Sequence, residues 1–171
     1  MRSSAHVRDL LSEKGVDHEL VELSGQCRTA ASAADLLGVP VADVAKSLLF
    51  RVDGDPVLVV VPGHLTVDTS LLAVALGARE IALAKARDVV ETTGYEPGAV
   101  PPCALAHPLR LIADPRVLDR DVVYCGGGTV TTMLRIRSVD LVGLVRPQVA
   151  RVGAEPGRTV GDPMAQSEVE R

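Results

Sequence analysis

The chain has 171 residues, and 47% of them are hydrophobic, which suffices for one domain with an apolar core. Its net charge of −4 and its 2% aromatic content argue against a broad basic face or a row of stacking rings for gripping nucleic acid. Three widely spaced cysteines without a CxxC pair disfavour a disulfide framework and a structural zinc site. No apolar run approaches the roughly 20 residues of a membrane span. We therefore expect a soluble, cytoplasmic protein that uses no metal or other cofactor and binds neither membrane nor DNA.

Capping residues and glycines divide the first half of the chain into alternating helices and strands. The expected elements are a helix capped by Ser4 and stopped by Gly15, an extended segment over 16–23, a helix over 30–37 capped by Thr29, and a hairpin of strands 47–52 and 57–61. The hairpin is the clearest of these because the Asp-Gly pair within its turn, 53–56, is typical of tight hairpin turns. Its apolar strands are expected to be central in the sheet.

The second half continues the alternation, with a helix capped by Asp68, a strand over 80–84, a helix over 87–92, strands over 109–113, 121–125 and 131–137, and a last helix capped by Ser138. These elements predict an α/β fold with a mixed sheet of six or seven strands and four or five helices packed outside it. Residues 1–146 are expected to form a single domain. Residues 147–171 combine glycine, proline and charges of both signs, which predicts a flexible C-terminal tail.

Lys46 is the most conspicuous candidate functional residue. The chain holds only three lysines among its 18 basic residues, so it generally uses arginine where any cation would serve. Lys46 stands just ahead of an apolar run, in a setting where a lysine ammonium acts as a compact, partly desolvated point charge. The alternative is a lysine that extends its ammonium to water from the edge of a strand.

Two glycine-bearing loops are candidate parts of a binding site. Residues 93–102 combine glycines and prolines into a rigid loop, and residues 125–129 contain three successive glycines after a strand. Both loops can expose backbone N–H groups to a ligand, although each is also compatible with an ordinary turn. Cys125 is either a nucleophile or, more in keeping with cysteine in general, a small buried side chain. The four histidines are scattered, and no clustered set of metal ligands is present in the sequence.

In order along the chain, these segments resemble the YbaK/EbsC family, which comprises the editing domain of bacterial prolyl-tRNA synthetases and its free-standing relatives. The resemblance covers residues 16–145 and includes the helix after Thr29, the run 44–50, the loop 93–102 and the glycines 126–128. It implies an α/β fold around a mixed, largely antiparallel, barrel-like sheet. It also implies an aminoacyl-tRNA deacylase that removes wrong amino acids from tRNA, commonly tRNA(Pro).

On the family pattern, Lys46 matches the essential lysine, Gly98 and Pro102 match the ends of the GxxxP loop, and Gly126 and Gly127 match the glycine turn at the pocket. The substrate-binding residues implied in this way are Thr29, Ser47, Gly98, Ala99, Val100, Pro101, Pro102, Cys125, Gly126 and Gly127. Some of these positions depart from the commoner pattern: Leu20 and Thr29 stand roughly where aromatic residues occur, Ser47 replaces Thr, Ala99 replaces Gly and Cys125 replaces Ser. The aromatic residues are those of the family's cysteinyl-tRNA(Pro) deacylases, so the departures leave open an amino acid other than cysteine.

The implied chemistry needs no protein nucleophile. Hydrolysis of the tRNA ester requires an oriented attacking group and stabilisation of the charge that develops on the carbonyl oxygen. Lys46 and loop amides can provide the stabilisation, while a substrate thiol or a water attacks. The expected substrate is mischarged tRNA, Cys-tRNA(Pro) or Ala-tRNA(Pro), with prolyl-tRNA synthetase as a further candidate partner. The alternative is a non-catalytic module that binds an aminoacyl-tRNA end or a small amino-acid-like ligand. In either case we expect the two glycine-bearing loops to form opposite walls of one pocket around Lys46.

Overall fold

Ten strands and six α-helices follow one another along residues 1–157, the part of the chain that the computed structural model describes. The helices are α1 (Ser4–Glu13), α2 (Ala30–Leu37), α3 (Thr69–Leu76), α4 (Ala86–Thr93), α5 (Pro115–Leu118) and α6 (Ser138–Val145), with one 3₁₀ turn, η1 (Val41–Asp43). The strands are β1 (His18–Glu22), β2 (Ala45–Val52), β3 (Asp55–Pro62), β4 (Thr66–Val67), β5 (Ile81–Leu83), β6 (Arg110–Ala113), β7 (Val122–Thr129), β8 (Thr132–Arg137), β9 (Gln148–Val149) and β10 (Gly153–Ala154).

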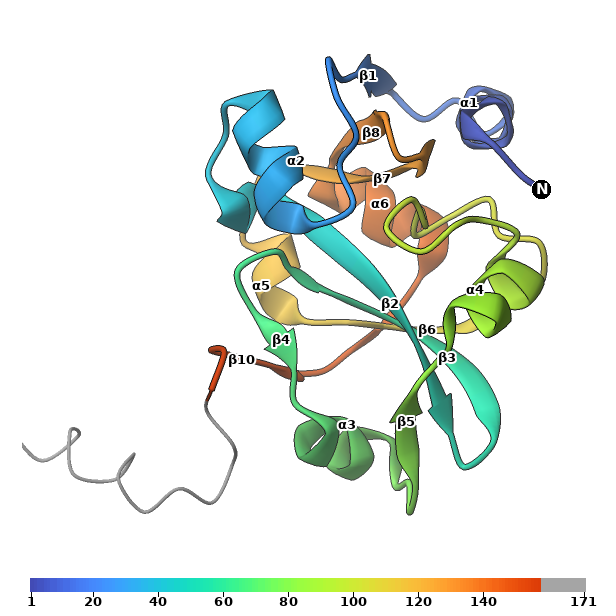
Figure 1. Cartoon of the computed structure of the whole chain (residues 1–171), viewed down its shortest axis with the longest axis vertical. Helices are drawn as coiled ribbons and strands as arrows, with labels where there is room; N and C mark the ends of the chain where they lie inside the picture. Colours follow the sequence, from blue (N-terminus) through green and yellow to red (C-terminus); the bar gives the residue numbers. More distant parts are fainter. Residues whose placement is uncertain (158–171) are drawn as a thin grey trace, which may run out of the picture.

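The strands form a five-stranded sheet in the order β5-β2-β3-β6-β9, a three-stranded sheet β1-β8-β7 and the pair β10-β4 (Figure 1). Only the β3–β6 and β6–β9 pairs are parallel, so the expected mixed, largely antiparallel α/β arrangement is confirmed. The expected barrel-like closure is not seen, because the strands of residues 1–157 form three separate sheets that do not close on one another. None of the helices in this part of the chain is long and apolar enough to cross a membrane.

The β2–β3 hairpin is central, as its sequence predicts, with β5 on one side and β6 on the other. Its turn is shorter than expected: only Asp53 and Gly54 lie outside the strands, and both have positive φ, +49° and +91°. Such a turn matches the right-handed twist of the paired strands. Successive residues of β3 point to opposite faces of the sheet, and those on each face are buried. Other side chains therefore cover the hairpin on both faces.

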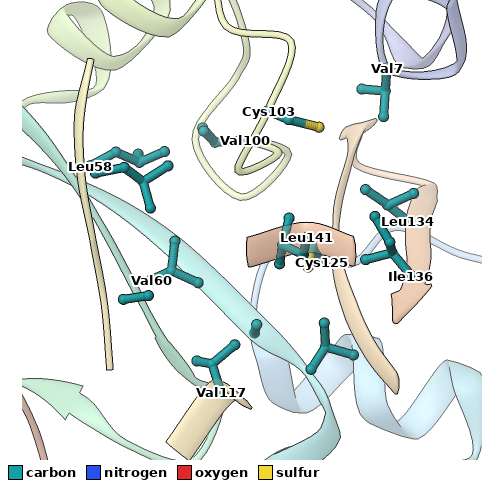
Figure 2. Close-up of a cluster of buried hydrophobic side chains, with 14 of the residues drawn as sticks. Val7, Leu58, Val60, Val100, Cys103, Val117, Cys125, Leu134, Ile136 and Leu141 are labelled. Atoms are coloured by element: carbon teal, nitrogen blue, oxygen red, sulfur yellow. The ribbon is translucent and has the colours of Figure 1, made fainter. Parts of the chain in front are cut away.

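The main core lies between the five-stranded and the three-stranded sheets. Figure 2 shows Leu58 and Val60 of β3 on one side of this cluster and Leu134 and Ile136 of β8 on the other. A second cluster on the opposite face of the hairpin contains Phe50 of β2 and packs against α3. The hairpin is therefore packed on both faces, and this packing holds the backbone from which the side chains of β2 project.

Some boundaries differ from those the sequence predicts. Ser3, and not Ser4, caps α1, and its N–H donates to His6 Nδ1 at 3.1 Å. Ser138 begins α6 but is not its cap, since its hydroxyl donates to the Arg120 carbonyl. The structure also has more elements than expected. The additional ones are α5, with four residues, η1, with three, and β4, β9 and β10, with two each; these lengths are too short to leave a periodic signal.

The segment after residue 147 is packed further than the sequence suggests. Gln148 and Val149 pair with β6, and Val152 is completely buried. The carboxylate of Asp114, itself buried, accepts the N–H groups of Val152 and Gly153 at 3.0 and 2.8 Å and forms a bidentate pair with Arg116 at 2.7–2.8 Å. The expected tail boundary at 147 is thus wrong, because long-range partners hold residues 148–154. Residues 158–171 lie outside the described part.

Asp114 makes the stability of the fold sensitive to acid. Burial alone would raise its pKa, but bonds from the Arg116 side chain and from the N–H groups of Gly153, Arg116 and Val152 outweigh burial and lower the pKa to about 2. A lowered pKa stabilises the fold above the unfolded-state value near 4, and this contribution is lost as the pH falls toward 2. We expect urea unfolding to show a loss of about 2 kcal/mol from this group between pH 5 and pH 2. Asp114→Asn should be less stable at pH 7 and lack this component, whereas substitution of the exposed Asp35 should preserve it.

Candidate functional site

A pocket of about 260 Å³ lies at the N-terminal end of β2, where α2, β7 and the loop 97–100 meet. Six of the residues expected from the sequence line it: Thr29, Lys46, Ser47, Gly98, Val100 and Gly126. β5 pairs with β2 only at Phe50–Val52, so one backbone edge of β2 at Lys46 and Ser47 is free of strand pairing. The pocket occupies this open edge, and its position follows from where β5 ends.

Lys46 supplies the pocket with a positive charge. It lies opposite Val61 in the β2–β3 ladder, and its side chain is half-buried. Burial lowers the pKa of its ammonium below the ordinary value, because a charged group loses hydration there. Among residues 1–157, no salt bridge neutralises Lys46. Its ammonium is therefore available to an oxygen of a bound ligand.

Residues at the start of helix α2 form a further part of the pocket lining. Thr29 caps α2, and its Oγ1 accepts the Ser32 N–H at 3.1 Å and donates to Ser32 Oγ at 3.0 Å. The Thr29 hydroxyl is thus engaged in holding the helix, which suggests that it positions the wall. Ala30 and Ala33 present methyl groups to the pocket, so this side is small and apolar.

The two glycine-bearing loops contact each other, and they do not form opposite walls as expected. A Cβ on Gly126 would collide with the Val100 carbonyl, and the Gly128 N–H donates to the Ala99 carbonyl at 3.1 Å. Gly98 has φ +86°, and a Cβ there would lie 3.0 Å from the Arg28 carbonyl. The glycines allow three backbone segments to approach more closely than side chains would permit.

Five expected substrate-binding residues do not line the pocket: Ala99, Pro101, Pro102, Cys125 and Gly127. All five are buried. The glycine run continues strand β7, since it pairs with β8 around a register shift, and a Cβ on Gly127 would lie 2.6 Å from the Thr132 carbonyl. Gly127 therefore faces backbone. A larger residue at Gly127 would therefore disturb the contact between β7 and β8 and would not project into the pocket.

Cys125 is a core residue. It is completely buried beside Leu141 and Leu134 (Figure 2), and burial raises the pKa of its thiol, with the nearby Cys103 raising it further. A thiol held neutral and out of reach of solvent cannot serve as a nucleophile. This arrangement favours the reading of Cys125 as a small hydrophobic side chain.

Replacing Cys125 by serine is expected to lower stability and leave the chemistry intact. The hydroxyl would be buried without a partner, at a cost of about 1–3 kcal/mol. The rate of the deacylation that the sequence resemblance implies, measured per folded molecule at a temperature where circular dichroism shows the variant folded, should stay within about twofold of wild type, because Cys125 does not line the pocket. Cys125→Ala serves as the apolar control. Loss of turnover in both folded variants, or a trapped aminoacyl-enzyme, would restore the nucleophile reading.

Eight lining residues are not among the site residues expected from the sequence: Cys27, Arg28, Ala30, Ala33, Val44, Ala45, Leu48 and Met133. The Cys27 thiol lies 3.7 Å from Met133 Sδ, and burial raises its pKa. Arg28 is exposed and adds a second cation to a pocket whose lining contains no carboxylate. The pocket thus attracts carbonyl oxygens and anions. Its cationic lining and small apolar wall suit an aminoacyl group joined to a phosphate-bearing chain.

No group of three or more His, Cys, Asp or Glu side chains is arranged to hold a metal ion within residues 1–157. The polar side chains of the pocket lining include the ammonium of Lys46, the guanidinium of Arg28 and the hydroxyls of Thr29 and Ser47. Such groups can orient an ester and stabilise negative charge on its carbonyl oxygen.

Comparisons with known proteins agree with this chemistry. Residues 24–144 match the model of a family described as the aminoacyl-tRNA editing domain. The multifunctional Ser/Thr-tRNA deacylase ProXp-y of Escherichia coli strain K12 is 29% identical over 147 residues, which cover 82% of this chain and 86% of that protein. Proline–tRNA ligase of Staphylococcus aureus strain Newman is 32% identical over 99 residues, 58% of this chain and 17% of the ligase. A crystal structure described as a candidate trans-editing enzyme for prolyl tRNA synthetase superposes with a TM-score of 0.82 at 30% identity, covering 88% of this chain and 96% of that one.

Proposed function

Because the chain belongs to the aminoacyl-tRNA editing domain family and is an enzyme of that family, a hydrolase of aminoacyl-tRNA esters, we propose that it clears mischarged tRNA(Pro) of a small amino acid. Cysteine and alanine are the first candidates. The observation that carries the proposal is the half-buried Lys46 ammonium, without a salt-bridge partner among residues 1–157, in a small pocket. Family membership argues against the non-catalytic binding module.

Lys46 acts in this proposal as an electrostatic and positioning group. A water, or the thiol of a cysteinyl substrate, adds to the ester carbonyl carbon, and negative charge develops on the carbonyl oxygen. Lys46 stabilises that charge in a setting where water is partly excluded, which strengthens the interaction. The carbon–oxygen bond to the ribose then breaks, and the ribose oxygen takes up the proton that the attacking water or thiol has lost and leaves as a hydroxyl. No protein thiol takes part.

The size of the pocket limits the amino acid. Ala30, Ala33 and Val44 from α2 and its neighbourhood, with Met133 of β8, surround a volume of about 260 Å³ without a carboxylate. Small side chains such as those of alanine and cysteine suit such an apolar lining, because burying their atoms costs no hydrogen bonds. Relatives linked by name to proline–tRNA ligase support tRNA(Pro) as the carrier. The net charge of −4 supports help from prolyl-tRNA synthetase in holding the tRNA.

Serine and threonine form a second candidate pair. The relative from Escherichia coli is named for Ser/Thr-tRNA. In this chain the Ser47 Oγ is buried and has no hydrogen-bond partner among the described residues, and Ser47 lines the pocket. A buried hydroxyl gains from a partner, so rotation of the Ser47 side chain toward the pocket would offer a hydrogen bond to a substrate hydroxyl.

The test is a panel of mischarged tRNAs. Purified wild-type protein and Lys46→Ala, prepared identically to control for contaminating hydrolases, are incubated with tRNA(Pro) carrying cysteine, alanine, serine or threonine, and with correctly charged Pro-tRNA(Pro). We expect rapid loss of at least one small amino acid by the wild type only, with Pro-tRNA(Pro) spared. Intact esters across the panel would refute the proposed activity. Hydrolysis confined to serine and threonine would replace the first pair by the second.

A further inference from the structure

The start of the chain lies against a loop of the candidate site. This loop, residues 94–106, follows α4 and contributes part of the pocket lining, and the first residues of the chain are beside it in Figure 1. The Arg2 N–H donates to the Gly94 carbonyl at 2.8 Å, and at the other end of the loop the Ala106 N–H donates to the Thr93 carbonyl at 2.9 Å. Arg2 is thus bound to the base of the loop, where its two ends meet.

The side chain of Arg2 packs onto this loop as well. A Cβ on Gly94 would lie 2.8 Å from both Cγ and Cδ of Arg2, and 3.1 Å from the methyl carbon of Ala106. The aliphatic part of Arg2 therefore fills the space that glycine leaves open between the two ends of the loop. A residue with a side chain at position 94 would push Arg2 away.

The guanidinium of Arg2 reaches a buried residue of the same loop. Burial raises the pKa of the Tyr95 hydroxyl, and the neighbouring guanidinium acts in the opposite direction. Tyr95 is completely buried, and its hydroxyl donates to the Ala104 carbonyl at 2.8 Å, which joins the two halves of the loop. Within residues 1–157 no carboxylate forms a salt bridge with Arg2. The position of Arg2 is thus set by its contacts with the loop and not by an ion pair.

The next two residues of the chain support the loop through the glycine run of β7. A Cβ on Gly128 would lie 2.8 Å from backbone atoms of Ser3 and Ser4, so this segment covers Gly128 directly. The Gly128 N–H in turn donates to the Ala99 carbonyl at 3.1 Å. Ala99 stands between the two residues of the loop that line the pocket. Residues 2–4 therefore hold the loop both at its base and behind its pocket-lining part.

We propose that Arg2 is a positioning residue of the candidate active site, which fixes the loop 94–106 so that Gly98 and Val100 keep their place in the pocket with Lys46. This role rests on the proposed function. Arg2 acts through the loop, since it is not part of the pocket lining. The loop belongs to no helix or strand, so its position depends on such contacts. A displacement of about 1 Å in a reacting site can lower the rate by up to about 100-fold.

Amide hydrogen exchange tests whether Arg2 holds the loop, and this readout needs no turnover. Arg2→Ala should speed the exchange of the Ala99 and Ala106 amides about tenfold or more, because both are bonded within the loop or at its base. The amides of the β2–β3 hairpin should keep their wild-type protection. Arg8→Ala is the matched control and should exchange as wild type does. Arg8 is exposed on α1, and its contact with Asp9, at 3.7 Å, is a surface ion pair.

The kinetic test uses the mischarged tRNA that the wild type hydrolyses fastest. Arg2→Ala should lower kcat about tenfold and change KM less than about threefold, because a displaced wall misaligns the bound ester without removing a group that binds it. Arg2→Lys keeps an aliphatic chain over Gly94, so it should restore most of the loop protection and most of kcat. Arg8→Ala should have the wild-type kcat and KM.

Three results would overturn the proposal: wild-type exchange in the loop of Arg2→Ala, an equal loss of protection in the β2–β3 hairpin, or faster loop exchange with an unchanged kcat. The second would show that Arg2 supports the whole fold and not the loop. Faster loop exchange, together with a wild type that spares every tRNA of the mischarged panel, would keep the anchoring of the loop and refute the proposed function. Normal loop exchange with an active panel would refute the anchoring alone.

Discussion

Lys46→Ala is expected to lower kcat/KM for the preferred mischarged tRNA by about 100- to 1000-fold, the usual effect of removing one group that stabilises a developing oxyanion. The reason is local. Lys46 is the only lysine of the pocket lining, and no second ammonium in that lining can take its place. The fold should be largely kept, because the side chain is only half-buried and makes no salt bridge in the described chain. Single-turnover hydrolysis with enzyme in excess measures the effect.

Lys46→Arg tests whether the reaction needs a compact ammonium or whether any positive charge at this position suffices. A guanidinium is wider and flatter than an ammonium, so in a pocket of about 260 Å³ it should restore little of the lost rate. Lys14→Ala, at the end of α1 and outside this pocket, controls for loss of general positive charge and should react at the wild-type rate. Turnover by Lys46→Ala close to that of Lys14→Ala would remove Lys46 from the mechanism.

Gly126→Val is expected to destabilise the protein by about 3 kcal/mol or more and to abolish deacylation. A Cβ at this position would collide with the Val100 carbonyl and lie 3.0 Å from the Ala99 carbonyl. Both obstacles are backbone, and the Ala99 carbonyl is also held by the Gly128 N–H. The loop 97–100 can make room for the new side chain only by moving, and this movement would displace the pocket residues Gly98 and Val100. Stability and activity should therefore fall together. Chemical denaturation followed by circular dichroism measures the first effect.

Gly143→Ala is the matched glycine control. Gly143 lies within α6, and a Cβ there would meet nothing within 4 Å. Alanine is the better helix former, so this variant should be more stable by up to about 1 kcal/mol and keep its activity. A Gly126→Val protein as stable as wild type would show that the loop and β7 do not form one wall.

Local chemistry is what the sequence conveys well in this protein. Thr29 and Gly38 at the two ends of α2 are a cap and a left-handed C-terminal residue, and both act within a few residues of their own position. The Asp53-Gly54 turn likewise predicts the hairpin, and the hairpin carries Lys46. Lys46 could be found because lysines are scarce in the chain and because it stands next to an apolar run, and both features are visible without a structure.

Long-range contacts account for what the sequence misses. Gly126 and Gly127 look like a loop because glycine is permissive, and only the structure shows that β8 continues to pair there and that the missing Cβ atoms make room for other backbone. Arg28 belongs to no recognisable motif, and it lines the pocket because it stands just before α2. Val152 sits in a segment that is polar by composition, and it is held by Asp114, which is 38 residues away in the chain.

The measurement that tests the central claim most directly is a crystal structure with an amide-linked analogue of alanyl-adenosine, in which the scissile ester cannot be hydrolysed. We expect the alanyl methyl against Ala33 and Met133, and the amide carbonyl oxygen within hydrogen-bond distance of Lys46 Nζ. An analogue bound on another face of the molecule, or one bound in this pocket with its carbonyl turned away from Lys46, would contradict the account.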